Sequence, residues 1–235
     1  MNYAIIAAGE GSRLAREGVA KPKPLVEIDG EPMIGRLINI FRRCDAESIS
    51  IIVNEEMHEV REYLESLKPS FDIPFNLVVK STPSSMHSFF ELSKVMQPGR
   101  FCLTTVDTIF KEPEFREYIN AMANANDYDG MMAVTSYIDD EKPLYVETDE
   151  NLDITGFRDE AYEGCRYISG GIYALNGKAV EVLGECMKKG ISRMRNFQRA
   201  LVEAGLKLKA FPMGKILDID HAGDIEKAEA FLKGN

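Results

Sequence analysis

The stretch Ile5-Ile6-Ala7-Ala8-Gly9-Glu10-Gly11-Ser12-Arg13-Leu14 reads as a buried strand that runs into a glycine-containing loop, and Pro22-Lys23-Pro24-Leu25-Val26 follows shortly after it. Because glycine reaches positive φ and has no side chain, Gly9 and Gly11 allow backbone amides to face an anionic ligand. Arg13 offers a planar fork that binds phosphate in bidentate fashion, and Lys23 offers a compact positive charge. The pattern predicts a phosphate-binding loop after the first strand, the alternative being a plain turn with two solvated cations.

Composition restricts the classes of partner. The chain has 235 residues, enough for one sizeable core, and a formal charge of -10, which argues against a nucleic-acid or anionic-membrane partner. Its four cysteines form no Cys-x-x-Cys pair, so neither a zinc site nor a redox pair is favoured. Because no run approaches the ~20 apolar residues of a membrane span, we expect a soluble, cytoplasmic protein.

Strand-like and helix-like segments alternate along the first half of the chain. Short apolar runs at 3–7, 49–53, 75–79 and 101–105 alternate with helical patterns at 33–44, 55–67 and 84–96. This alternation is typical of a mostly parallel sheet with helices on both faces. The second half is richer in strands. Strand-like runs stand at 130–138, 144–148, 154–157 and 167–175, with few helices between them. Helical patterns return at 176–188 and 194–204, followed by a strand at 206–211 and a last helix at 223–232. We therefore expect mixed or antiparallel strands to extend the sheet there.

Acidic residues follow two of these segments. Asp107 comes after the apolar run 101–106, where its carboxylate would emerge at the end of a strand beside the glycine loop. Asp218 and Asp220 lie two residues apart, so they share one face if the segment is extended. Carboxylates that lie beside phosphate oxygens suit Mg²⁺. The alternative for Asp107 is a turn or capping role, and for one of the later pair it is the N-cap of the last helix.

The combination of these residues resembles the sugar-nucleotide pyrophosphorylase, or nucleotidyltransferase, family. Its opening pattern, Ala-Ala-Gly-x-Gly-x-Arg-Leu followed by Pro-Lys-Pro-Leu-Val, stands here at 7–14 and 22–26, and shorter similarities follow at 154–157, 171–173 and 217–220. The resemblance implies an α/β fold, a Rossmann-like three-layer αβα sandwich with a mixed, mainly parallel sheet. It also implies one domain, 1–235, with a nucleotide-binding half at 1–110 and an acceptor-binding half at 111–235.

By the same resemblance, the protein would be a Mg²⁺-dependent enzyme that condenses a nucleoside triphosphate with a sugar 1-phosphate, giving a nucleotide sugar and pyrophosphate. Arg13 and Lys23 would be catalytic, and Asp107 and Asp218 would hold the metal. The nucleotide would contact Ala7, Ala8, Gly9, Glu10, Gly11, Ser12, Lys80, Ser84 and Ser85. The acceptor would contact Asp159, Gly170 and Gly171. The oligomeric state is left open.

The base and the acceptor are the points at which the chain departs from the family. Lys80 and Ser85 stand where pyrimidine-reading members carry glutamine and glycine, and Arg158-Asp159-Glu160 stands where many members have Glu-Lys-Pro. Residues 85–89 are loosely similar to cytidylyltransferases for small phosphorylated alcohols, such as choline or glycerol phosphate. A CTP-dependent enzyme of that kind, or a non-catalytic nucleotide-binding regulator on the same fold, is therefore the alternative to the sugar 1-phosphate enzyme.

Two other classes fit the sequence less well. A dinucleotide-binding oxidoreductase would need Gly-x-Gly-x-x-Gly, but Leu14 occupies the last position. A glycosyltransferase would carry a mid-chain Asp-x-Asp, whereas Asp107 is followed by Thr108 and Ile109.

Overall fold

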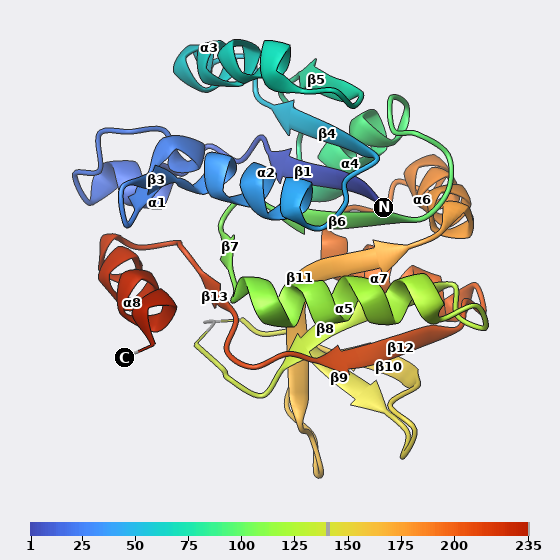
Figure 1. Cartoon of the computed structure of the whole chain (residues 1–235). Coiled ribbons are helices and arrows are strands. Elements are labelled where there is room, and N and C mark those ends of the chain that lie inside the picture. Colours follow the sequence, from blue (N-terminus) through green and yellow to red (C-terminus); the bar gives the residue numbers. More distant parts are fainter. Residues whose placement is uncertain (140–141, 235) are drawn as a thin grey trace.

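The chain folds around a mixed β-sheet with helices on both faces (Figure 1). The computed structural model describes residues 1–139 and 142–234. The strands of the main sheet are β1 (Asn2–Ala7), β4 (Ser48–Val53), β5 (Phe75–Val79), β6 (Phe101–Thr105), β8 (Gly130–Thr135), β9 (Tyr145–Thr148), β10 (Ile154–Arg158), β11 (Tyr167–Leu175) and β12 (Leu208–Pro212). Two short antiparallel ladders pair β2 (Glu27–Ile28) with β3 (Glu31–Pro32) and β7 (Thr108–Ile109) with β13 (Leu217–Asp218).

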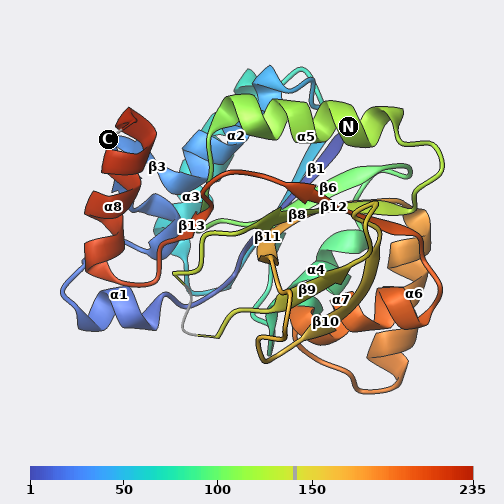
Figure 2. The same cartoon turned by 90° about the horizontal axis from the view of Figure 1, so that it is seen from below.

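Helices cover the sheet in two layers, which are seen edge-on in Figure 2. The helices are α1 (Ser12–Arg16), α2 (Met33–Arg43), α3 (His58–Leu67), α4 (Ser85–Ser93), α5 (Glu112–Asn124), α6 (Gly177–Lys188), α7 (Met194–Glu203) and α8 (Ala222–Lys233), with 3-10 turns at Lys23–Leu25 and Lys68–Ser70. Residues of α2, α3, α5 and α8 belong to one apolar core, and residues of α4, α6 and α7 belong to the other. The predicted three-layer α/β sandwich is confirmed.

Strand β1 shows why the middle of the sheet is apolar on both faces. Its side chains alternate, with Tyr3 and Ile5 in one core and Ala4 and Ile6 in the other, and all are nearly inaccessible to water. Parallel strands buried on both faces need such continuous apolar runs. The runs predicted from the sequence are therefore strands.

The strand order brings distant residues to one edge. Strands β6, β1, β4 and β5 are adjacent and parallel, so their carboxyl ends meet where the glycine loop follows β1 and Asp107 follows β6. Strand β11 is antiparallel to β6, β8 and β9, which confirms the mixed second half. No helix among residues 1–139 and 142–234 is long and apolar enough to cross a membrane.

Helix α5 was not among the predicted helices; it precedes the strands β8 to β11, between which few helices were expected and the described residues form none. Phe115, Tyr118, Ile119 and Met122 are buried at the i, i+3, i+4, i+7 spacing of an amphipathic helix. Pro113 stands in the first turn, where its missing N–H costs nothing. Strand β8 ends at Thr135 rather than at residue 138, and Tyr137 and Ile138 are exposed.

Candidate functional site

The glycine loop opens onto a cavity of about 470 Å³, which we call the loop cavity. Residues 8–14 line it together with Lys23, residues 82–85, Ser88, residues 105–107 and Asp220. Gly11 adopts φ 62°, and a Cβ added there would lie 2.8 Å from the Cβ of Lys23, so the loop and the lysine stem are in close contact. A Cβ at Gly9 would meet no atom within 4 Å, so this glycine leaves space in the cavity itself.

Lys23 lies between two carboxylates at the rim of this cavity. Its Nζ is 2.5 Å from Asp107 Oδ2 and 2.9 Å from Asp220 Oδ1, and its side chain is only 10% exposed. Arg13 Nη1 lies 3.1 Å from the other oxygen of Asp220. Burial alone would lower the pKa of Lys23, but Asp107 and Asp220 outweigh it and raise the pKa above its usual value. Lys23 is therefore a cation throughout the neutral range.

The segment that follows β12 supplies the late carboxylates. Leu217 and Ile219 are buried, while Asp218 and Asp220 face the cavities on the opposite side of this extended stretch. Pairing of Asp218 with Thr108 places it beside Asp107 in the β7–β13 ladder. Thus the predicted shared face of Asp218 and Asp220 is found, and Asp220 joins the cluster around Lys23.

Glu17, which directly follows helix α1, binds the two residues that come after Asp220. Glu17 accepts a hydrogen bond from Ala222 N at 2.7 Å, and its other oxygen lies 2.6 Å from His221 Nδ1. The carboxylate of Asp224 also accepts from His221 N at 2.8 Å in a capping box at the start of α8. The hydrogen bond to Glu17 raises the pKa of His221 above its usual value. These contacts fix Asp220 next to the glycine loop.

The chemistry of the acidic residues suits a magnesium ion. In the described ranges, no three His, Cys, Asp or Glu side chains form a group that could hold a metal by itself. Magnesium uses one or two carboxylates together with phosphate oxygens and water, and the Asp107 and Asp220 oxygens already approach a single cation, the Lys23 ammonium. Asp218 lines the neighbouring cavity with both of them. The donor set therefore fits Mg²⁺ if a nucleotide supplies the remaining oxygens.

Serines form the far side of the loop cavity, at the start of α4. Ser84 Oγ lies 2.8 Å from His87 Nδ1, so this hydroxyl bonds to a ring nitrogen rather than capping a backbone amide of the helix. Ser88 is 2% exposed and lies 2.6 Å from Thr82 Oγ1. Ser84 and Ser85, which are predicted to contact the nucleotide, line the loop cavity.

Two residues predicted to contact the nucleotide lie outside the loop cavity. The ammonium of Lys80 is 3.0 Å from Glu91 Oε1 in α4, so its charge is directed along the surface of the helix. Ala7 is the last residue of β1 and is buried in an apolar core. Along this stretch the loop cavity is lined by Ile6 and by residues 8–14, but not by Ala7.

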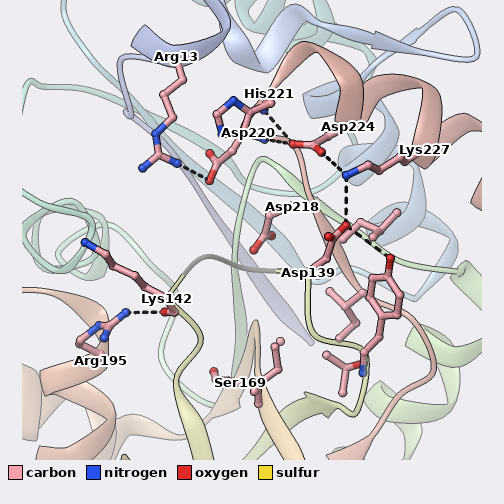
Figure 3. Close-up of a pocket in the computed structure, with 16 residues that line it drawn as sticks. Arg13, Asp139, Lys142, Ser169, Arg195, Asp218, Asp220, His221, Asp224 and Lys227 are labelled. Atoms are coloured by element: carbon pink, nitrogen blue, oxygen red, sulfur yellow. Dashed lines mark hydrogen bonds and ion pairs between the residues drawn. The ribbon is translucent and has the colours of Figure 1, made fainter. Parts of the chain in front are cut away.

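A second cavity, of about 370 Å³, continues from Asp107 toward β11 and α7. In this central cavity, Asp107, Asp218 and Asp220 contribute acidic groups, and Lys142, Arg193 and Arg195 contribute cations. A third, outer cavity shares Asp218 and Asp220 and extends toward α8 (Figure 3). Figure 3 shows Arg13 bonded to Asp220 on one side of it and Arg195 bonded to the Lys142 carbonyl on another.

The polar floor of the central cavity was not foreseen from the sequence. Gln198 is 3% exposed, accepts a hydrogen bond from Ser169 Oγ at 2.8 Å and donates one to the Tyr173 hydroxyl at 3.4 Å. Burial raises the pKa of Tyr173 to about 12, so the phenol stays protonated. The signal was present, because Gln198 stands in the buried stripe of α7 with Met194, Phe197 and Leu201.

The residues predicted to contact the acceptor divide into three roles. Asp159 lines neither the central nor the outer cavity; its oxygens bind Arg195 at 2.6 Å and Arg199 at 2.8 Å, so it orients Arg195 instead. Gly170 is required for packing, because an added Cβ would overlap Ile216 Cδ1 and lie 3.1 Å from the Ala133 carbonyl. Gly171 has φ 73° and lines the central cavity at an irregularity in the pairing of β11 with β8.

Comparisons with known proteins agree with this architecture. The model of the MobA-like NTP transferase domain matches residues 3–159. The 2-aminoethylphosphonate cytidylyltransferase of Lancefieldella rimae is 30% identical over 113 residues, which are 47% of this chain and 44% of that relative. The match therefore spans less than half the length of this curated protein.

Solved structures share the fold over nearly the whole chain. The inositol-1-phosphate CTP transferase from T. maritima superimposes with a TM-score of 0.80 and 18% identity, over 99% of this chain and 96% of that one. A Bacillus anthracis protein provisionally assigned as a glucose-1-phosphate thymidylyltransferase has a TM-score of 0.85 and 20% identity, over 100% and 96%. These similarities confirm the predicted Rossmann-like fold.

Proposed function

The chain belongs to the MobA-like NTP transferase domain family, and from this we propose that it transfers a nucleotidyl group from a nucleoside triphosphate to the phosphate or phosphonate of a small acceptor, releasing pyrophosphate. One observation carries the proposal. Lys23, Asp107 and Asp220 meet where the loop cavity joins the central cavity, so cations and carboxylates surround the point between two anionic substrates.

The transfer needs alignment and charge neutralisation more than acid–base chemistry. A phosphate oxygen of the acceptor is already an anion; it attacks the α-phosphorus, a new P–O bond forms, and the bond to the β-phosphate breaks as pyrophosphate leaves. Lys23 and Arg13 line the loop cavity and would neutralise the phosphates during this step. Backbone amides at residues 8–11 would hold the triphosphate.

Magnesium is the proposed cofactor. Asp107, with Asp218 or Asp220, would hold it, and when bound it would neutralise phosphate charge and polarise the α-phosphoryl group. The cations Lys142, Arg193 and Arg195 of the central cavity would attract the anionic acceptor. Asp159 would act on the acceptor through Arg195, and Gly171 would contribute backbone at the cavity wall.

We propose CTP as the donor, with a small phosphorylated alcohol or a small alkylphosphonate as the acceptor. The names of the Lancefieldella rimae relative and the T. maritima structure support this choice, since both describe cytidylyl transfer to compounds of that size. Ser84, Ser85 and the small central cavity are compatible with it. A sugar 1-phosphate acceptor with a thymidine or uridine nucleotide is the second candidate, supported by the fold match to the Bacillus anthracis protein.

A pyrophosphate-release screen tests both candidates. Each nucleoside triphosphate is combined with a panel of sugar 1-phosphates, phosphorylated alcohols and 2-aminoethylphosphonate in the presence of Mg²⁺. We expect release with CTP and one small acceptor. Release only with a sugar 1-phosphate and another nucleotide would favour the second candidate, and acceptor-independent release of inorganic phosphate would contradict the proposal.

A further inference from the structure

Asp107 and Asp220 approach each other from segments far apart in the chain, and a single positive group joins them. Asp107 occupies the turn between β6 and β7, whereas Asp220 follows β13 at the other end of the sequence. One oxygen of each lies on the Lys23 ammonium, at 2.5 and 2.9 Å. Two carboxylate oxygens around one point are also the arrangement that a divalent cation requires.

Lys23 has a second set of partners within reach of the same stem. Its Cβ is fixed against Gly11, and its side chain lines the loop cavity in which the triphosphate is proposed to bind. The ammonium can therefore bond to carboxylates on one side or to phosphate oxygens on the other. It cannot share the position between the carboxylates with a metal, because two cations would overlap there.

We propose that Asp107 and Asp220 form a shared carboxylate pair with two alternative cations, the Lys23 ammonium in the nucleotide-free protein and the divalent metal in the nucleotide complex. Asp220 thus binds Lys23 in the nucleotide-free protein and the metal in the nucleotide complex. The proposal rests on the proposed function only in naming a triphosphate as the ligand that attracts Lys23 away.

The charges determine the order of binding. A metal that entered alone would leave the largely buried Lys23 without an anionic partner, which is unfavourable. A triphosphate that enters with the metal gives Lys23 new anionic partners at the moment its old ones are taken. Metal and nucleotide should therefore strengthen each other's binding, and by linkage the coupling must be equal in both directions.

Binding of Mn²⁺, followed by electron paramagnetic resonance without nucleotide, tests the exchange directly. We expect Lys23→Met to bind Mn²⁺ about 10-fold more tightly than the wild type or better, within the ~5–150-fold range of common coupling effects. Arg13→Met is the control for charge, because Arg13 contacts Asp220 at 3.1 Å without lying between the carboxylates, and it should change the affinity less than about 3-fold. Lys21→Met, which removes an exposed lysine paired with Glu27, should leave both Mn²⁺ binding and turnover unchanged.

The nucleotide supplies the second half of the test. With an α,β-methylene analogue of CTP, wild-type affinity for Mn²⁺ should rise at least about 10-fold, and the gain should be clearly smaller in Lys23→Met, where only the phosphate oxygens contribute to it. Equal Mn²⁺ affinities of wild type and Lys23→Met without nucleotide, or equal gains in Lys23→Met and Arg13→Met, would overturn the exchange. Failure of the proposed function would be seen separately, as wild-type protein that releases no pyrophosphate in the screen. Circular dichroism verifies that each variant is folded.

Discussion

Replacing Gly11 with alanine tests whether the glycine loop fixes the position of Lys23. Gly11 has φ 62° and ψ 26°, and an added Cβ would come within 2.8 Å of Lys23 Cβ. The left-handed backbone costs an L-residue about 1–2 kcal/mol. Inserting a methyl group into an occupied contact costs a further ~1–3 kcal/mol. The free energy of unfolding should therefore fall by about 2–5 kcal/mol, with a Tm decrease of about 2–4 °C for each kcal/mol.

The same substitution should also reduce turnover, because the lysine stem must move to admit the methyl group. A displacement of about 1 Å in a positioned group commonly costs about 100-fold in rate. Gly205→Ala is the matched control, since Gly205 has φ 77° just after α7 and no atom within 4 Å of an added Cβ. It should lose only the ~1–2 kcal/mol of backbone strain and keep wild-type turnover.

Stability is measured by urea denaturation followed by circular dichroism, because the chain has no tryptophan. Turnover is measured by pyrophosphate release. Equal destabilisation of Gly11→Ala and Gly205→Ala, together with wild-type turnover of Gly11→Ala, would refute the reasoning that Gly11 sets the place of Lys23.

Three further predictions concern the metal, the acceptor and pH. Asp107→Asn should lower Mg²⁺-dependent pyrophosphate release by about 10²–10³-fold without unfolding the protein. In the wild type, EDTA should abolish pyrophosphate release, and added Mg²⁺ should restore it. Unchanged release by Asp107→Asn would remove Asp107 from the site. Gln198→Met should leave the Ser169 hydroxyl without its hydrogen-bond acceptor and lower the free energy of unfolding by about 1–3 kcal/mol. It should also raise KM for the acceptor substrate but not for the nucleotide. Equal changes in both KM values would contradict the place of Gln198 in the central cavity. The pKa of His221 is raised above 6.5 and that of Glu17 is lowered below 4.5. The ion pair therefore contributes its full stabilisation between pH 4.5 and pH 6.5, where His221 is protonated and Glu17 is ionised in the folded protein. The stabilisation fades as the pH rises through the folded pKa of His221, so the Tm difference between wild type and His221→Gln should be largest at pH 4.5–6.5 and shrink at higher pH; a constant difference would argue against the ion pair.

The fold was predictable because its strands are short buried runs. The bounds at 75–79, 101–105 and 167–175 agree with β5, β6 and β11, because each is a short run rich in strand-forming residues; β6 is buried on both faces, whereas β5 lies at an edge of the sheet and is partly exposed. Helix α5 was not predicted, although its buried residues carry a readable helical spacing. Pairing partners could not be read, because the order of strands depends on contacts between distant segments.

For the candidate site, the sequence predicted which kinds of side chain lie near it better than it predicted which residues those side chains bind. Lys80 and Asp159 are charged residues near the predicted places, but Glu91 binds the first, and Arg195 and Arg199 bind the second. An ion pair forms with whichever opposite charge the fold brings within about 4 Å, and the sequence gives no measure of that distance. The buried position of Gln198 could be read from the stripe of α7, but its partners Ser169 and Tyr173 could not, because they lie on another element.

The sequence by itself determined the α/β class, the nucleotidyltransferase family and the glycine loop with Arg13 and Lys23, because strand burial and φ at Gly11 depend on residues close together in the chain. Only the tertiary structure decided that Asp220, almost two hundred residues from Lys23, joins Asp107 around the Lys23 ammonium. The reason is physical: β7 pairs with β13, and Glu17 holds the start of α8, so the late segment lies against the loop. Electrostatic interactions act through space, and the folded chain sets the distances over which they act.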